Sequence, residues 1–71
     1  MDASERLQAL CSDKNGKITR YPESLRMLDD GVEHYFVEVT SKEGIQYGLQ
    51  AYGLEAIELY KETMRAVGRD T

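Results

Sequence analysis

The sequence predicts a single small α+β domain of order α-β-β-β-α, a three-stranded antiparallel sheet with two helices packed on one face. Residues 32–41 and 45–52 alternate apolar and polar side chains, which is typical of strands, and Lys42-Glu43-Gly44 separates the two runs. At both ends of the chain the apolar residues recur with helical spacing. The domain covers residues 1–71, and we expect residues 68–71 to be a frayed tail.

The composition is that of a globular protein, with 41% hydrophobic and 31% charged residues. A chain this short buries only about 60% of its unfolded surface, so we expect marginal stability. Cys11 is the one cysteine, which excludes an internal disulfide and fits a reducing compartment. No apolar run approaches the roughly 18 residues of a membrane span, and residues 1–5 show no apolar signal core. We therefore expect a cytoplasmic protein without a membrane partner.

The charge is acidic and unevenly spread. The net charge is -4, and residues 21–40 carry five acidic residues against Arg26 alone. A protein that binds nucleic acid usually has a basic excess, because neutralising phosphates supplies most of the affinity. The charge balance argues against a nucleic-acid partner.

A first helix is predicted over residues 2–14. Asp2 is a suitable N-cap, and Glu5 completes a capping-box pattern three residues later. Asn15-Gly16 ends the helix, and we expect Gly16 to adopt the left-handed conformation. The apolar face of this helix comprises Ala3, Leu7, Leu10 and Cys11.

The next stretch is predicted less completely. Residues 17–21 fit a short strand, although Pro22 would confine it to a sheet edge or end it. Residues 24–29 predict the first strand of the sheet, followed by a turn at Asp30-Gly31.

Two registers of this hairpin are open. A two-residue turn pairs Met27 with His34, whereas a three-residue turn over residues 30–32 pairs Met27 with Tyr35 and Leu25 with Val37. The three-residue turn is favoured, because it places Leu25 and Met27 on the apolar side of the sheet.

The second hairpin is better specified. A three-residue loop with Gly44 left-handed brings the apolar residues of the two strands together on one face. An amphipathic helix follows over residues 54–67, after Gly53 ends the strand. The cross-strand pairs expected in this hairpin are Val39 with Tyr47, Val37 with Leu49, and Tyr35 with Ala51. The predicted core comprises Leu10, Tyr35, Val37, Leu49, Ile57 and Tyr60.

The sequence shows no catalytic pattern. His34 is the only histidine, and it has neither a second histidine nor an activated Ser or Cys to complete a triad or a zinc site. The glycines of residues 44–53 lie around a hairpin and form no phosphate-binding loop before a helix. We therefore expect no enzyme, no cofactor and no metal.

The second face of the sheet is the candidate contact surface. Phe36 and Tyr52 alternate with the core set, so two helices on the other face would leave these aromatic side chains exposed to a partner or sealed in a homodimer. Acidic residues flank them and would meet a protein partner with a basic surface. The predicted site comprises Asp29, Asp30, Glu33, Phe36, Glu38 and Tyr52.

The element order and length resemble those of the double-stranded-RNA-binding domain. The segment 31–39 resembles that family's Gly-Pro-x-His…Phe stretch without its proline, and Gly48 and Gly53 fall near its glycine-rich third strand. The resemblance implies duplex RNA binding, here through the first helix with Lys14, Lys17 and Arg20. The family has a Lys-Lys pair at the start of its last helix, where this chain has Gly-Leu-Glu-Ala at residues 53–56, so no binding residue is carried over from the family.

Size, acidity and fold class are similar to those of phage-encoded inhibitors such as anti-CRISPR proteins, some of which present carboxylates where DNA phosphates would bind. The leading hypothesis is therefore a non-enzymatic protein-binding module, in its sharper form an inhibitor that occupies a nucleic-acid-binding surface of its target. The alternative is a nucleic-acid-binding domain of double-stranded-RNA-binding topology.

Overall fold

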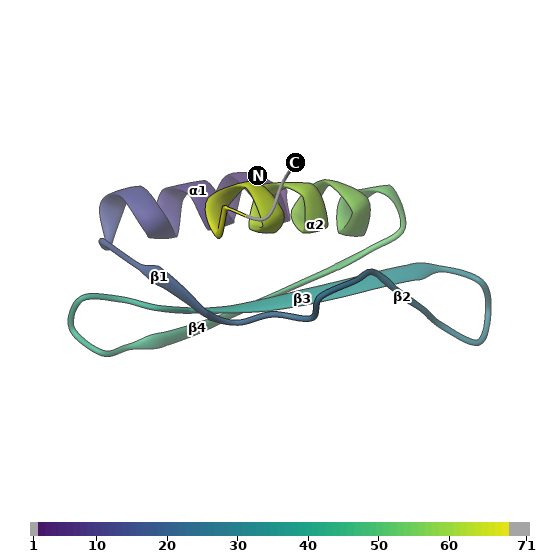
Figure 1. The fold of residues 1–71 in the computed structure, drawn as a ribbon, viewed down its shortest axis with the longest axis horizontal. Coiled ribbons are helices and arrows are strands. Elements are labelled where there is room, and N and C mark those ends of the chain that lie inside the picture. The colour runs from purple at the N-terminus through teal and green to yellow at the C-terminus, as the bar shows by residue number, and fades with distance from the viewer. Residues whose placement is uncertain (1, 69–71) are drawn as a thin grey trace.

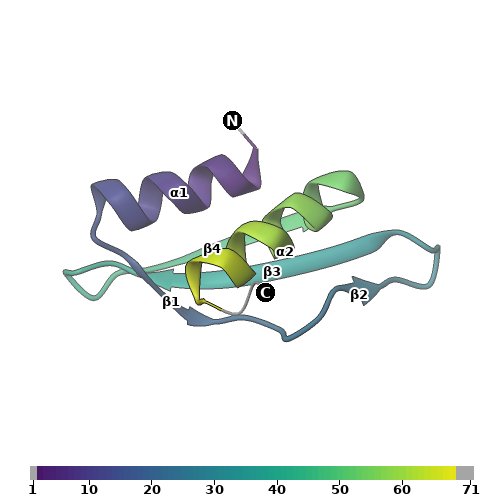
Figure 2. The ribbon, with the colours of Figure 1, turned by 45° about the horizontal axis from the view of Figure 1, so that its top comes forward.

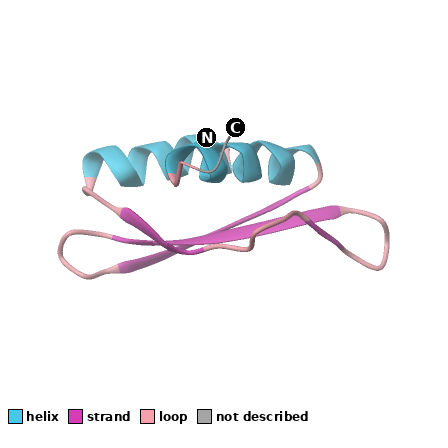
Figure 3. Ribbon diagram, viewed as in Figure 1, coloured by secondary structure: helices cyan, strands magenta, loops and turns pink. Residues whose placement is uncertain are grey.

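The computed structural model describes residues 2–68, and its two helices lie on one side of an antiparallel sheet (Figures 1 and 3). The predicted α+β class, with both helices on one face, is confirmed. The expected tail is described only at Gly68, and residues 69–71 lie outside the described residues. In chain order the elements are α1 (Ala3–Asp13), β1 (Lys17–Arg20), β2 (Arg26–Met27), β3 (Glu33–Thr40), β4 (Gln46–Tyr52) and α2 (Leu54–Ala66).

The long strand β3 is the centre of the sheet. Along one edge it pairs with β4 over its length from His34 to Thr40. Its other edge is shared, because β1 pairs with residues 38–40 and β2 with residues 33–34 (Figure 2). The sheet thus has four strands instead of the expected three, since two short strands occupy the place of one.

The division between β1 and β2 lies at Pro22. Proline has no N–H to donate to a ladder, and the chain leaves the sheet after Arg20. The Tyr35 hydroxyl donates a hydrogen bond of 2.5 Å to the Pro22 carbonyl, which holds this irregular segment against the core. The strand expected over residues 24–29 is reduced to the two residues of β2.

The favoured register of the first hairpin is wrong by two residues. Met27 pairs with Glu33 instead of Tyr35, and the loop comprises residues 29–31, closed by a 2.9 Å bond from the Leu28 N–H to the Val32 carbonyl. The third residue of such a loop is left-handed, and Gly31, with φ of 82°, meets this need where the β-branched Val32 would be strained. A shift of two residues preserves the alternation of the strand, so Leu25 still packs against the core.

The second hairpin is confirmed in all three predicted pairs, Val39 with Tyr47, Val37 with Leu49, and Tyr35 with Ala51. Its loop ends at Gly44, which is left-handed with φ of 90°. A 2.8 Å bond from the Ser41 N–H to the Ile45 carbonyl closes the loop.

Helix α1 begins as predicted but ends differently. Asp2 caps it by accepting a 2.9 Å bond from the Glu5 N–H. The left-handed residue after the helix is Asn15, with φ of 51°, and Gly16 does not take this role. Glycine is needed at position 16 for space, because a Cβ atom there would lie 2.6 Å from Val39 Cγ1.

The core lies between the helices and the sheet. Leu10 and Tyr60 are half-buried and pack against it, and Tyr60 meets Tyr35 edge-to-face with ring centroids 5.3 Å apart. The expected core position of Ile57 is wrong: Ile57 is half-buried, and α2 turns Ala56 and Leu59 inward instead. The buried core comprises Ala3, Leu7, Tyr35, Val37, Val39, Leu49, Ala51, Ala56 and Leu59.

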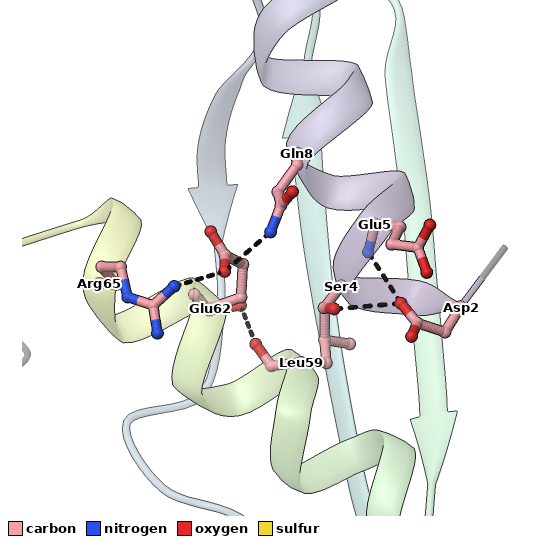
Figure 4. Close-up of polar contacts among 8 residues, drawn as sticks. Asp2, Ser4, Glu5, Gln8, Leu59, Glu62 and Arg65 are labelled. Atoms are coloured by element: carbon pink, nitrogen blue, oxygen red, sulfur yellow. Dashed lines mark hydrogen bonds and ion pairs between the residues drawn. The ribbon is translucent and has the colours of Figure 1, made fainter.

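Polar side chains tie the two helices together at their exposed side. Glu62 on α2 accepts a 3.1 Å bond from the Gln8 side chain on α1 and pairs with Arg65 at 2.9 Å (Figure 4). Neither helix within residues 2–68 is long and apolar enough to cross a bilayer.

Candidate interaction surface

No described element covers the sheet face opposite the helices (Figure 1). We call this surface the open face. Every second residue of β3 points onto it, and the cross-strand register places residues of the other three strands beside them. The open face comprises Lys17, Arg20, Arg26, His34, Phe36, Glu38, Thr40, Gln46, Gly48, Gln50 and Tyr52.

Three aromatic rings gather towards the end of the open face where β3 begins and β4 ends. His34 lies opposite Tyr52, with ring centroids 4.9 Å apart, and 6.2 Å from the ring of Phe36 on its own strand. Gln50 orders this group, because its side-chain oxygen lies 3.1 Å from His34 Nε2 and accepts a 3.3 Å bond from the Tyr52 hydroxyl. We call His34, Phe36 and Tyr52 the aromatic cluster.

Basic side chains line the edge of the open face formed by β1 and β2. The Arg20 guanidinium lies 6.0 Å from the centroid of the Phe36 ring and 3.8 Å from a carboxylate oxygen of Glu38. Arg26 is paired opposite His34, and Lys17 opposite Thr40. The aromatic cluster is therefore bordered by Arg20 and Arg26 on one side and by the side-chain amide of Gln50 on the other.

The structure separates the predicted acidic residues. Glu38 reaches the open face, where Arg20 offsets its charge. Asp29 and Asp30 are exposed in the loop between β2 and β3, where Asp30 accepts a 3.1 Å bond from the Val32 N–H. Glu33 shares the side of β3 that Tyr35 occupies, facing the helices.

Of the six predicted site residues, the structure thus unites Phe36, Glu38 and Tyr52 on one surface. Asp29 and Asp30 lie beyond its end nearest to His34 and Tyr52. Glu33 is not part of it, because successive residues of a strand point to opposite faces.

Gly48 creates a shallow depression on the open face. It is paired opposite Glu38 and has no side chain, so a hollow of about 250 Å³ opens between Phe36, Glu38 and Gln50. This hollow lies directly beside the aromatic cluster and provides space for an inserted side chain.

The sequence named Lys17 and Arg20 only as basic residues for the RNA-binding alternative, and it did not predict a basic edge beside the aromatic cluster. A signal existed for Arg26, because a strand that turns Leu25 and Met27 to the core side must turn Arg26 to the other side. No local signal placed Arg20, whose position depends on a β-bulge between Ile18 and Arg20 and on pairing with a distant strand.

Burial shifts the pKa values of two groups that lie away from the open face, Cys11 and Tyr35. Burial raises the pKa of the half-buried Cys11 thiol, and nearby Glu62 raises it further, which disfavours a reactive thiolate. Burial likewise raises the pKa of Tyr35. Within residues 2–68, no group of three or more His, Cys, Asp or Glu is placed to hold a metal ion.

No protein-family model, curated protein or solved structure matches the chain.

Proposed function

We propose that this chain is a non-enzymatic protein-binding module and that the open face is its contact surface. The observation that carries the proposal is the aromatic cluster on a sheet face that no described element covers. Aromatic side chains dominate the binding energy of many protein interfaces, because they bury a large area with few rotatable bonds.

The order of the cluster supports this role. Tyr52 is 53% exposed, yet its ring lies beside that of His34 and its hydroxyl is bonded to Gln50. A side chain already held in place loses little conformational entropy when a partner covers it. Polar side chains surround the cluster and provide the hydrated rim that typical interfaces have.

We further propose that the partner carries a basic surface near the loop of Asp29 and Asp30. These two exposed carboxylates lie beside the end of the open face, where they would attract cations and speed association. In the sharper form of the proposal, the partner is a nucleic-acid-binding protein that the chain inhibits by covering its basic surface. The double reversal D29K/D30K should then slow association and reduce its salt dependence.

The test compares two equally exposed residues on different surfaces. Tyr52 and Ile45 are each 53% exposed, but Ile45 lies at the β3–β4 loop outside the open face. The tagged chain and the variants Tyr52→Ala and Ile45→Ala are used to capture proteins from the source cells. A partner that uses the open face should bind Tyr52→Ala about 30-fold more weakly in titrations with the purified protein, and Ile45→Ala unchanged. Equal binding by both variants would remove the open face as the site.

Nucleic-acid binding is the second candidate, favoured by the basic edge. Arg20 and Arg26 border rings on which bases could stack, and Lys17 lies farther along the same edge, opposite Thr40. It ranks second because Glu38 offsets one of these cations and the chain carries a net charge of -4. Fluorescence anisotropy with labelled oligothymidylate and duplex RNA separates the candidates. Three phosphate contacts predict that the logarithm of the binding constant falls with the logarithm of the salt concentration with a slope of about -2 on a single strand. No binding at micromolar protein would exclude this candidate.

A further inference from the structure

The outer edge of β4 is a second unoccupied feature of the sheet. Among residues 2–68, β4 pairs only with β3, so its seven residues leave one side open to solvent. Natural proteins protect such edges with charged side chains, proline, bulges or a covering segment. Residues 46–52, Gln-Tyr-Gly-Leu-Gln-Ala-Tyr, contain no charge and no proline, and the β3–β4 register has no bulge.

The hydrogen bonds show which backbone groups of β4 are free. The Ser41 N–H donates to Ile45, and the Gly53 N–H donates to Glu33, so odd-numbered residues form the bonded pairs at both ends of the hairpin. In a regular antiparallel ladder this alternation continues along the strands. The N–H and C=O groups of the even-numbered residues therefore point away from β3, at Gln46, Gly48, Gln50 and Tyr52.

An apolar groove runs beside this free edge, between β4 and α1. Its volume is about 330 Å³, and it is lined by Arg6, Ala9, Leu10, Tyr47, Gly48 and Leu49. The groove lies on the helix side of the sheet, whereas the aromatic cluster lies on the opposite side. A strand added to the edge would point every second side chain into the groove.

We infer that the β4 edge binds an extended segment of a partner protein as an additional strand. The free backbone groups would supply main-chain hydrogen bonds, and the groove would select apolar side chains at alternate positions. Arg6 is the only charged residue lining the groove, and it makes no ion pair within the described part of the chain. The segment should therefore carry a carboxylate near the apolar residues. This inference does not rest on the function proposed for the open face.

A second copy of the chain is a poorer occupant. In a symmetric β4–β4 pair, the helix-side residues of the second copy would be Tyr47, Leu49 and Ala51. Leu49 and Ala51 are already buried in their own subunit, only 6% and 2% exposed, and would not enter the neighbouring groove. The side chains of an extended peptide segment are not already buried in a folded subunit, so they are free to enter the groove.

Two substitutions at one glycine test the inference. Gly48→Pro removes an N–H that faces the free edge, whereas Gly48→Ala keeps it, and a Cβ atom at this position meets nothing within 4 Å. Peptides are selected for binding to the wild-type chain from a random nine-residue display library, and their affinities are measured by fluorescence polarisation. We expect Gly48→Pro to bind them at least about tenfold more weakly than Gly48→Ala, which keeps the N–H group at this position. Peptides with Asp or Glu should also lose affinity for Arg6→Gln.

Amide hydrogen exchange provides a readout that does not depend on the folding of a variant. In the free chain the amides of Gln46, Gly48, Gln50 and Tyr52 should exchange rapidly, and a bound peptide should protect them. Peptides methylated at every second backbone nitrogen should lose binding when the methyl groups replace the N–H groups that face β4. They should keep binding when the methyl groups lie on the other nitrogens.

Several results would overturn the inference. One is that the library yields no peptide, and another is equal binding of the peptides by Gly48→Pro and Gly48→Ala. A third is that the peptides no longer bind the Phe36→Ala variant, because they would then occupy the open face. Protection of the same four amides by concentration-dependent dimerisation of the free chain would show instead that a second copy occupies the edge.

Discussion

Replacing Gly16 with alanine tests how closely the chain is packed where it passes from α1 to β1. The added Cβ atom would lie 2.6 Å from Val39 Cγ1 and 3.0 Å from the Leu10 carbonyl oxygen. Carbon atoms in ordinary contact are about 3.5–4.0 Å apart, so the segments must separate by about 1 Å. Val39 is fully buried, so its side chain cannot swing outward into solvent. Overpacking of this kind costs about 1–3 kcal/mol, against a total of about 4–11 kcal/mol for a domain of this length.

Gly48→Ala is the matched control, because its added Cβ atom meets nothing within 4 Å. Urea unfolding should show a lower free energy of unfolding for Gly16→Ala and an unchanged or slightly higher one for Gly48→Ala. Thermal melting should place Gly16→Ala roughly 4–24 °C below the wild type, since 1 kcal/mol shifts the midpoint of a small domain by about 4–8 °C. If Gly16→Ala were as stable as Gly48→Ala, the close approach to Val39 would be refuted.

Two further predictions concern the core. Leu59→Ala should lower the free energy of unfolding by about 2–5 kcal/mol, because Leu59 is fully buried, and Ile57→Ala should lower it by less, because Ile57 is half-buried. Urea unfolding of both variants checks this order, and the reverse order would show that α2 is rotated. Burial raises the pKa of Tyr35 well above its ordinary value of 10.0, so the folded state holds this phenol neutral where the unfolded chain ionises it. The contribution of this neutral phenol to the free energy of unfolding should be fully present below about pH 10 and should fall as the pH rises further. Urea unfolding from about pH 8 to 11 should show a smaller decline for Tyr35→Phe than for the wild type. Parallel profiles for the two proteins would contradict the assignment.

Local chemistry predicted the elements whose signals lie within a few residues of each other. The second hairpin was predicted in register because Gly44 and the alternation on both sides of it require the same pairing. The start of α1 was predicted because an N-cap such as Asp2 acts within one helical turn.

The first hairpin shows how one residue limits such a prediction. Placing its loop at residues 30–32 overlooked that the left-handed position would fall on Val32, whereas a loop over residues 29–31 places Gly31 there. The assignment of faces survived this error because the shift was two residues, an even number. Phe36 and Tyr52 therefore reached the open face as predicted.

Features that depend on distant pairing were decided only by the tertiary structure. The positions of β1 and β2 along β3, and with them Arg20 and Arg26 beside the aromatic cluster, follow from long-range register and a bulge. The need for glycine at position 16 comes from Val39, which is remote in sequence. The groove beside β4 exists because α1, which is remote from β4 in sequence, lies next to that strand on the helix side of the sheet. Such contacts depend on how separate elements meet in space, which no local pattern of side chains specifies.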